Sequence, residues 1–177
     1  MVNKFLIAIA GIVVVMAVLV AMPSIGSNQD ATELRIKYVR DHIAKMESGI
    51  LDVTTSEVLR IENDGSATYS RTDSYPTMIT TDERRFSLNS DEIKRLKALI
   101  FETGFMQIPV SKYDEREGLA NYTRYQIVVH QGDDNDQKPI TWFNQEASQV
   151  PVPSIITNIG SQLDAIIERH IRLTENI

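Results

Sequence analysis

One apolar segment limits what this chain can fold into more than any other feature. The run from Phe5 to Met22 contains no charge, no amide and no proline, and no other run in the chain is as apolar. As an α-helix it would span roughly 27 Å, enough to cross the hydrocarbon core of a bilayer. We therefore expect a cytoplasmic stub at 1–4, a transmembrane helix at 5–22, a polar tether at 23–29 and a single extracytoplasmic domain at 30–177.

The same segment raises the question of a retained anchor or a cleaved signal peptide. Signal peptides have apolar regions of about 7–15 residues, and this run is longer and is followed directly by Pro23. Those features favour an anchor. A small-x-small sequence at 24–26, directly before Ser27, leaves cleavage of residues 1–26 as the alternative.

The charges on either side of the segment predict its orientation. Lys4 precedes it, and the first cation after it is Arg35. The positive-inside tendency then places the N-terminus in the cytoplasm and the domain outside, in a single-pass arrangement at the cell membrane. A glycosylation sequon at Asn121 agrees with an outside location, although it leaves open whether Asn121 is modified. Small residues such as Gly11 and the pair at 17 and 21 either form a contact with another membrane helix or reflect ordinary membrane-helix composition.

The composition excludes several classes of function. A formal charge of −6, a pI near 5.1 and the lack of a basic run argue against nucleic-acid binding. The chain has no cysteine, which excludes disulfides, thiolate metal sites and a lipidated cysteine anchor. An extracytoplasmic domain stabilised by its core alone is more usual in prokaryotic envelopes than among small eukaryotic secreted modules.

The start of the predicted domain is ambiguous from local pattern. Asp30 and Glu33 have capping-box spacing, and apolar residues between 36 and 46 recur at helical intervals. Apolar and charged residues also alternate at strand spacing over 34–38 and again at Ala44 and Met46. Either a helix or a strand over 30–47 is compatible with these patterns.

The rest of the domain has clearer signals. Asp64-Gly65 predicts a tight turn between two strands, and a hairpin is also predicted near the C-terminal third. Asn89 and Glu92 form a second capping-box pattern that opens a helix ended by Gly104. The predicted strands cover 57–63, 66–71, a short stretch near 84–88, 121–131 and 138–143, and the predicted helices cover 89–104 and 154–173. This combination predicts an α+β fold in which an antiparallel sheet packs on two amphipathic helices.

The pattern of elements also resembles that of a known family. The relevant segments are Ser48-Gly49-Ile50, VLRIENDGSATYS from Val58, FSLNSDEIKRLKALIFETGF from Phe86, YQIVVHQG from Tyr125, ITWF from Ile140 and the proline-led last helix. They are similar to emfourin-like domains, known as protein inhibitors of thermolysin-type metalloproteases, and to related uncharacterised prokaryotic domains. The resemblance implies an α+β fold with a strand around 42–47, and it carries no individual binding residue over to this chain.

No catalytic, cofactor-binding or metal-binding residue is predicted. His42, His130 and His170 are far apart in sequence and lack the short spacing of zinc ligands. The acidic loop at 133–136 lacks the EF-hand pattern, which favours a solvated hairpin tip over a calcium site. We find no nucleophile motif or phosphate-binding loop, and no carboxylate whose sequence context predicts a raised pKa.

Aromatic residues concentrate in two segments near the C-terminal end, with Tyr122 and Tyr125 in the first and Trp142 and Phe143 in the second. Alternate members are expected in the core, and the alternative is a patch that faces a partner. The sequence therefore predicts a non-catalytic, membrane-anchored, extracytoplasmic protein-binding module, an accessory subunit of a membrane or envelope complex. A tethered inhibitor of a thermolysin-type metalloprotease is the alternative function.

Overall fold

The computed structural model describes residues 33–75, 78–132 and 137–172. The predicted membrane segment at 5–22, the tether at 23–29 and the acidic loop at 133–136 lie outside these residues. Within the described part of the chain, no helix is both long enough and apolar enough to cross a membrane.

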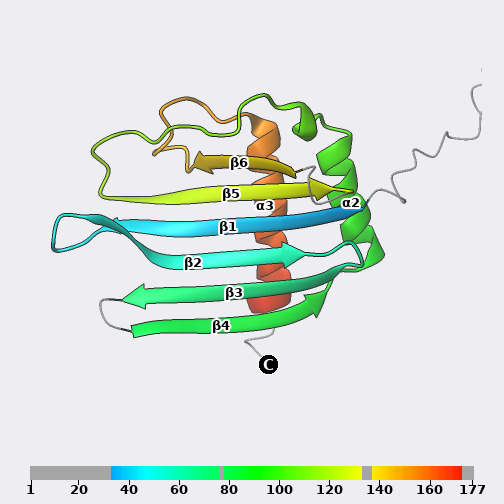
Figure 1. Ribbon diagram of the computed structural model, residues 1–177, viewed down its shortest axis with the longest axis horizontal. Coiled ribbons are helices and arrows are strands. Elements are labelled where there is room, and N and C mark those ends of the chain that lie inside the picture. Colours follow the sequence, from blue (N-terminus) through cyan, green and yellow to red (C-terminus); the bar gives the residue numbers. More distant parts are fainter. Residues whose placement is uncertain (1–32, 76–77, 133–136, 173–177) are drawn as a thin grey trace, which may run out of the picture. The chain divides into compact units, whose positions relative to one another are not determined.

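A six-stranded antiparallel sheet forms the centre of the domain (Figure 1). Its strands are β1 (Leu34–Lys45), β2 (Leu51–Ile61), β3 (Ser66–Tyr75), β4 (Met78–Ser87), β5 (Asn121–Gln131) and β6 (Gln137–Phe143). Their order across the sheet is β4-β3-β2-β1-β5-β6, so that β1 is an interior strand with long partners on both sides.

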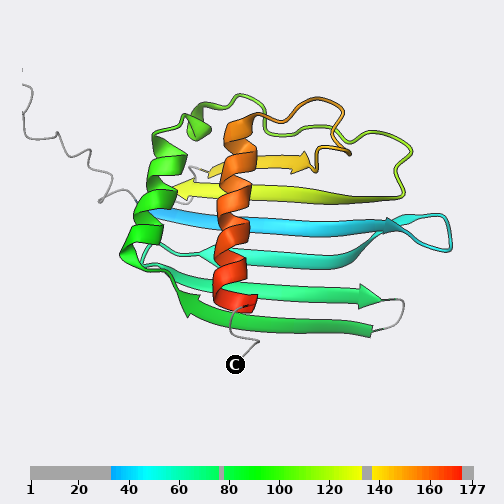
Figure 2. The same cartoon turned by 180° about the vertical axis from the view of Figure 1, so that it is seen from behind.

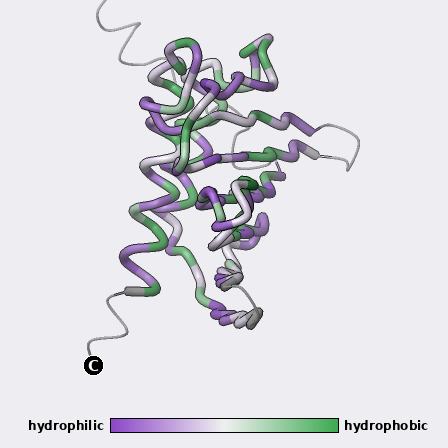
Figure 3. Tube along the Cα trace, turned by 90° about the vertical axis from the view of Figure 1, so that its left-hand side faces the viewer, coloured by the Kyte–Doolittle hydropathy of each residue, from purple (hydrophilic) through white to green (hydrophobic). Residues whose placement is uncertain are grey.

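Two helices, α2 (Ser90–Phe101) and α3 (Ser154–Ile167), run across the strands (Figure 2). Both lie on the same side of the sheet (Figure 3). A short 3-10 turn, η2 (Phe105–Gln107), follows α2, and a π-turn, η3 (Glu168–Arg172), continues α3. The α+β class and the antiparallel sheet with two helices are therefore confirmed. No described helix or strand covers the other face of the sheet (Figure 1), which is called the open face below.

The ambiguous N-terminal segment is a strand. In β1, Ile36 lies opposite Ile61 of β2 and Val129 of β5, and Tyr38 lies opposite Leu59 and Ile127. All of these side chains are buried. The alternating pattern prevails over the helical one because partners on two flanking strands bury every second side chain of β1.

Two local predictions are confirmed with small changes. Gly65 has a φ of 83° in the β2–β3 turn, but Asp64 does not have a positive φ and instead accepts a hydrogen bond from Ser66 N at 2.8 Å. Asn89 caps α2, and its capping box with Glu92 is complete. Gly104 also adopts a φ of 83°, directly before η2.

The prediction of a short strand at 84–88 was wrong in length. β4 covers Met78–Ser87 and pairs with β3 along its whole length. Its polar residues between 80 and 85 do not alternate with apolar ones, because this edge strand extends beyond the helices and most of its side chains meet solvent.

The two edges of the sheet are protected in different ways: one is covered by a neighbouring segment, and the other carries charged side chains. At the β6 edge, Thr141 N donates to Ser111 O at 2.9 Å and Tyr113 N donates to Thr141 O at 2.9 Å, so the 111–113 segment covers the strand. At the β4 edge, the described residues contain no further strand. β4 carries charged side chains, including the Arg84–Asp82 pair at 3.1 Å, which disfavour pairing of this edge with a strand of another molecule.

Candidate functional site

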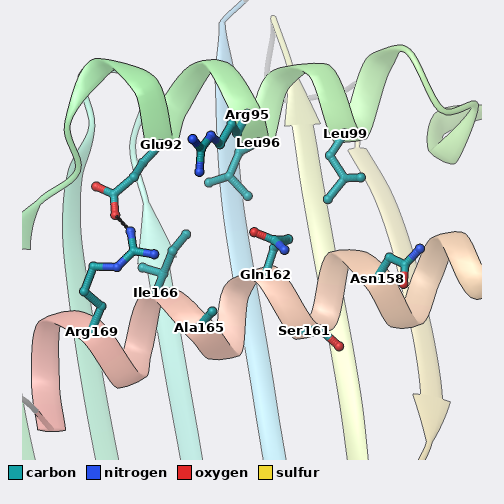
Figure 4. A pocket seen from close by; sticks show the side chains of 10 residues that line it. All are labelled: Glu92, Arg95, Leu96, Leu99, Asn158, Ser161, Gln162, Ala165, Ile166 and Arg169. Carbon is teal, nitrogen blue, oxygen red and sulfur yellow. Dashed lines mark hydrogen bonds and ion pairs between the residues drawn. The ribbon is translucent and has the colours of Figure 1, made fainter.

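A groove with a volume of about 430 Å³ lies between α2 and α3 (Figure 4). It lies on the outer side of the helix layer, away from the sheet. Its lining comprises Glu92, Arg95, Leu96, Leu99, Asn158, Ser161, Gln162, Ala165, Ile166 and Arg169. The helical period places these side chains together because each helix contributes residues three or four positions apart.

One end of the groove is closed by a charged cluster. Glu92 is 7% exposed, and its carboxylate accepts hydrogen bonds from Asn89 N at 3.0 Å and from Arg169, as drawn in Figure 4. His170 Nε2 lies 3.2 Å from the same carboxylate, and the His170 ring stacks on Phe86 of β4. Burial alone would raise the pKa of Glu92, but these hydrogen bonds hold that pKa below its usual value. The cluster therefore fixes the start of α2 to the end of α3.

The remainder of the groove has an apolar floor and a polar rim. Leu96 and Ile166 are buried, and Leu99 is half-buried. Arg95 is exposed and lines the groove from α2, while the α3 side offers amide and hydroxyl groups. This arrangement can receive apolar side chains and can form ion pairs with carboxylates.

A second charged network lies under α3, on the helix-covered face of the sheet. Arg40 of β1 binds Glu57 of β2 (Nε to Oε2, 2.6 Å) and Asp164 of α3 (Nη1 to Oδ1, 2.9 Å). Tyr38 donates to Asp164 at 3.1 Å, and Tyr69 donates to Glu57 at 2.6 Å. Glu57 is 4% exposed and Arg40 15%, so the network is largely shielded from water.

The pKa values of the two carboxylates in this network are shifted in opposite directions. Burial would raise the pKa of Glu57, but hydrogen bonds from Arg40 and Tyr69 lower it below its usual value. Burial dominates at Asp164 and raises its pKa despite Arg40 and Tyr38. The expectation that no carboxylate has a raised pKa was therefore wrong for Asp164. Its neighbour Tyr38 is 126 positions away in sequence, so no local pattern could have shown it.

The aromatic concentration is divided between the two faces of the sheet. Tyr125 and Trp142 stack with centroids 5.3 Å apart on the helix-covered face, and Tyr38 lies 6.4 Å from Tyr125. On the other face, the Tyr122 and Phe143 rings meet edge to face at 5.7 Å. Trp142 and Phe143 are both buried, while the two tyrosines are half-buried. The core interpretation holds for Trp142, whereas Phe143 is buried on the open face, outside the hydrophobic core cluster.

A small pocket of about 210 Å³ opens beside the Tyr125–Trp142 stack. Gly160 of α3 lies against it, and a Cβ there would come within 3.0 Å of Trp142 Cζ2. A glycine at this position lets α3 approach the aromatic rings closely. The pocket is narrow, and Asp164 at its rim is already bonded to Tyr38 and Arg40.

The histidines lie in three separate places. His42 is half-exposed near the far end of β1, His130 is half-buried on the open face in β5, and His170 belongs to the Glu92 cluster. His170 contacts both Glu92 and Phe86. No group of three potential metal-ligating side chains lies together within the described ranges.

The chain matches no protein-family model and no curated protein. The similarity to emfourin-like domains therefore stays an interpretation of the sequence pattern.

Proposed function

We propose that this chain is a non-catalytic, membrane-anchored, extracytoplasmic protein-binding module that serves as an accessory subunit of a membrane or envelope complex. The observation that carries the proposal is the groove between α2 and α3, with its apolar floor and its arginine-bearing rim. The apolar segment at 5–22 supports the membrane part of the proposal from sequence alone.

The chemistry of the groove defines the partner that it would bind. An amphipathic helix laid along the groove would place apolar side chains on Leu96, Leu99 and Ile166. Carboxylates on the same segment would pair with Arg95. Glu92 would not repel them strongly, since its charge is already compensated by Arg169. The partner is therefore an acidic, amphipathic segment of another membrane or envelope protein.

Adjacent residues of α2 provide a matched test. Arg95 and Lys94 are both exposed cations, but only Arg95 lines the groove. Full-length chain extracted in mild detergent should recover a stoichiometric partner. We expect Arg95→Glu to lose that partner and Lys94→Glu to retain it. Equal recovery by both variants, or recovery of the wild-type chain as a lone monomer, would contradict the proposal.

The alternative function, a tethered inhibitor of a thermolysin-type metalloprotease, is favoured by one observation. The β1–β2 hairpin projects beyond the neighbouring strand ends (Figure 1), and Ile50 at its tip is 67% exposed. An exposed apolar side chain on a projecting turn is suited to enter a protease cleft. Under this alternative, the purified full chain should inhibit thermolysin and Ile50→Asp should abolish inhibition, while Val150→Asp, at another exposed apolar position, should not. No inhibition by the wild-type chain at high concentration would discard it.

A further inference from the structure

The open face gathers cations that are scattered in the sequence. Lys37 of β1 lies directly opposite Arg60 of β2, and Arg35 of β1 lies directly opposite His130 of β5. Residues opposite one another in an antiparallel pair project from the same face, with Cβ atoms about 5 Å apart. Three strands thus bring two arginines, a lysine and a histidine to one end of the face, although the whole chain has a net charge of −6.

These side chains line a small hollow of about 170 Å³. Its other contributors are Glu62 and the β1 and β2 residues Ile36 and Ile61, which are buried on the helix side. Three cationic side chains thus face a single carboxylate. The hollow is large enough for one compact polyatomic ion and too small for an extended ligand.

A buried polar atom in the lining lacks a partner. Nδ1 of His130 is buried and makes no hydrogen bond within the described residues. Buried polar atoms are normally satisfied, and those without a protein partner often bind a water or an ion. Nδ1 itself is closed to solvent, so an oxyanion in the hollow would act on His130 through the charge placed beside its ring, and would pair with cationic side chains of the lining.

We propose that the hollow formed by Arg35, Lys37, Arg60 and His130 binds a phosphate group, either of free phosphate or of an anionic lipid headgroup. Guanidinium groups match phosphate geometry and can bind two of its oxygens at once. The lipid source depends on the membrane anchoring proposed above, because the hollow lies at the end of the sheet where β1 begins, and β1 follows the predicted tether in the sequence. The phosphate chemistry itself does not depend on anchoring.

The chain allows a direct measurement because it contains only three histidines. Full-length protein in an uncharged detergent is titrated with inorganic phosphate while the histidine ring signals are followed by NMR. We expect His130 to shift and saturate. His42 and His170, which lie elsewhere, should not shift and serve as internal controls for fold and pH.

Two arginines on the open face provide matched variants. Arg60→Gln removes a lining cation and should weaken phosphate binding about ten-fold or more. Arg85→Gln removes another exposed cation of the same face, one that pairs with Glu83 and does not line the hollow, and should change binding less than two-fold. If both variants weaken phosphate binding equally, phosphate is attracted by the overall positive charge of the open face and not by this hollow, and the proposed site is wrong.

The two phosphate sources are separated in phosphate-free nanodiscs. A His130 shift in discs containing phosphatidylglycerol, but not in discs of phosphatidylcholine alone, would identify the lipid headgroup. A shift that requires added phosphate would identify free phosphate, and would stand even if the chain proved not to be anchored. If His130 shifts in neither medium, or shifts only together with His42 and His170, the proposal is wrong.

Discussion

Arg40 and Asp41 are neighbours in β1, yet they form ion pairs in very different surroundings. Arg40 faces the helices and binds Glu57 at 2.6 Å, with side chains 15% and 4% exposed. Asp41 faces the open side and binds Arg124 at 2.7 Å, with side chains 11% and 43% exposed. The alternation of a strand thus places two ion pairs of similar length on opposite faces of one sheet.

The length of an ion pair therefore does not determine how much it contributes to the stability of the fold. Around Arg40, loss of the cation would leave the carboxylate of Glu57, which is 4% exposed, without its compensating charge, and such a buried uncompensated charge is costly. Around Asp41, Arg124 reaches solvent, and Ser56 also donates to Asp41 at 2.7 Å, so water and a hydroxyl can replace a lost partner. The helix-covered network should therefore depend far more strongly on each of its members.

The largest expected effect follows from Arg40→Met, which preserves much of the side-chain volume but removes the charge. We expect a loss of about 3–5 kcal/mol of unfolding free energy, because Glu57 and Asp164 lose their shared cation. Urea unfolding followed by the fluorescence of Trp142, the single tryptophan, measures it. If Arg40→Met lowers the unfolding free energy by no more than the loss of a surface ion pair does, the two faces do not differ in how strongly stability depends on their ion pairs.

The second effect concerns the pH dependence of stability. The lowered pKa of Glu57 contributes stability that is present above its unfolded pKa and lost as pH falls through its folded pKa. The raised pKa of Asp164 has the opposite sign, because the folded state takes up its proton first and gains stability as pH falls.

Two variants separate these contributions in unfolding curves measured at a series of pH values between neutral and acidic. Glu57→Gln should make stability less sensitive to acid, and Asp164→Asn should make it more sensitive. Slopes that change in the same direction for both variants would show that the carboxylates titrate alike, contrary to their different surroundings.

A smaller effect is expected on the open face. Arg124→Ala removes the cation beside Asp41, and we expect a loss of at most about 1 kcal/mol, as for other pairs with one solvent-exposed partner. The same urea assay gives the value. A cost comparable with that of Arg40→Met would show that the open face is covered in the intact protein, for example by a partner.

The smallest expected effect is that of salt. In molar sodium chloride the cost of Arg124→Ala should fall by a few tenths of a kcal/mol, since exposed charges are screened. The cost of Arg40→Met should stay constant, since its pair is shielded. Equal salt dependence of the two costs would mean that water reaches both networks.

Elements with local signals could be predicted from the sequence, and those that depend on distant partners could not. Asn89 and Glu92 specify the start of α2 by hydrogen bonds within four residues, and Gly65 specifies its turn. β1 remained ambiguous because its alternation becomes decisive only beside β2 and β5. In α3, Ile156 is fully buried and its neighbour Ile155 is only partly buried, a difference that depends on how the helix sits on the sheet.

The proposed sites were harder to predict than the fold. Arg35, Lys37, Arg60 and His130 do not form a basic run, and only strand register brings them together. The local sequence likewise does not distinguish Arg95 and Gln162 from other exposed helix residues. They line one groove only because α2 and α3 lie side by side in the fold. A useful signal was nevertheless present in β1, where Arg35 and Lys37 share one face of a strand by simple alternation.

The interior position of β1 has a mechanical consequence. The chain enters the described domain at Glu33, directly before a strand held by ladders to β2 on one side and β5 on the other. A pull on the N-terminal side, along the strand, would load both ladders at once in shear, because their hydrogen bonds run perpendicular to the strand. An edge strand would instead peel away bond by bond. A domain pulled through β1 can therefore bear tension without unravelling from the point where the chain enters it, which is the property that the proposed membrane anchoring would require.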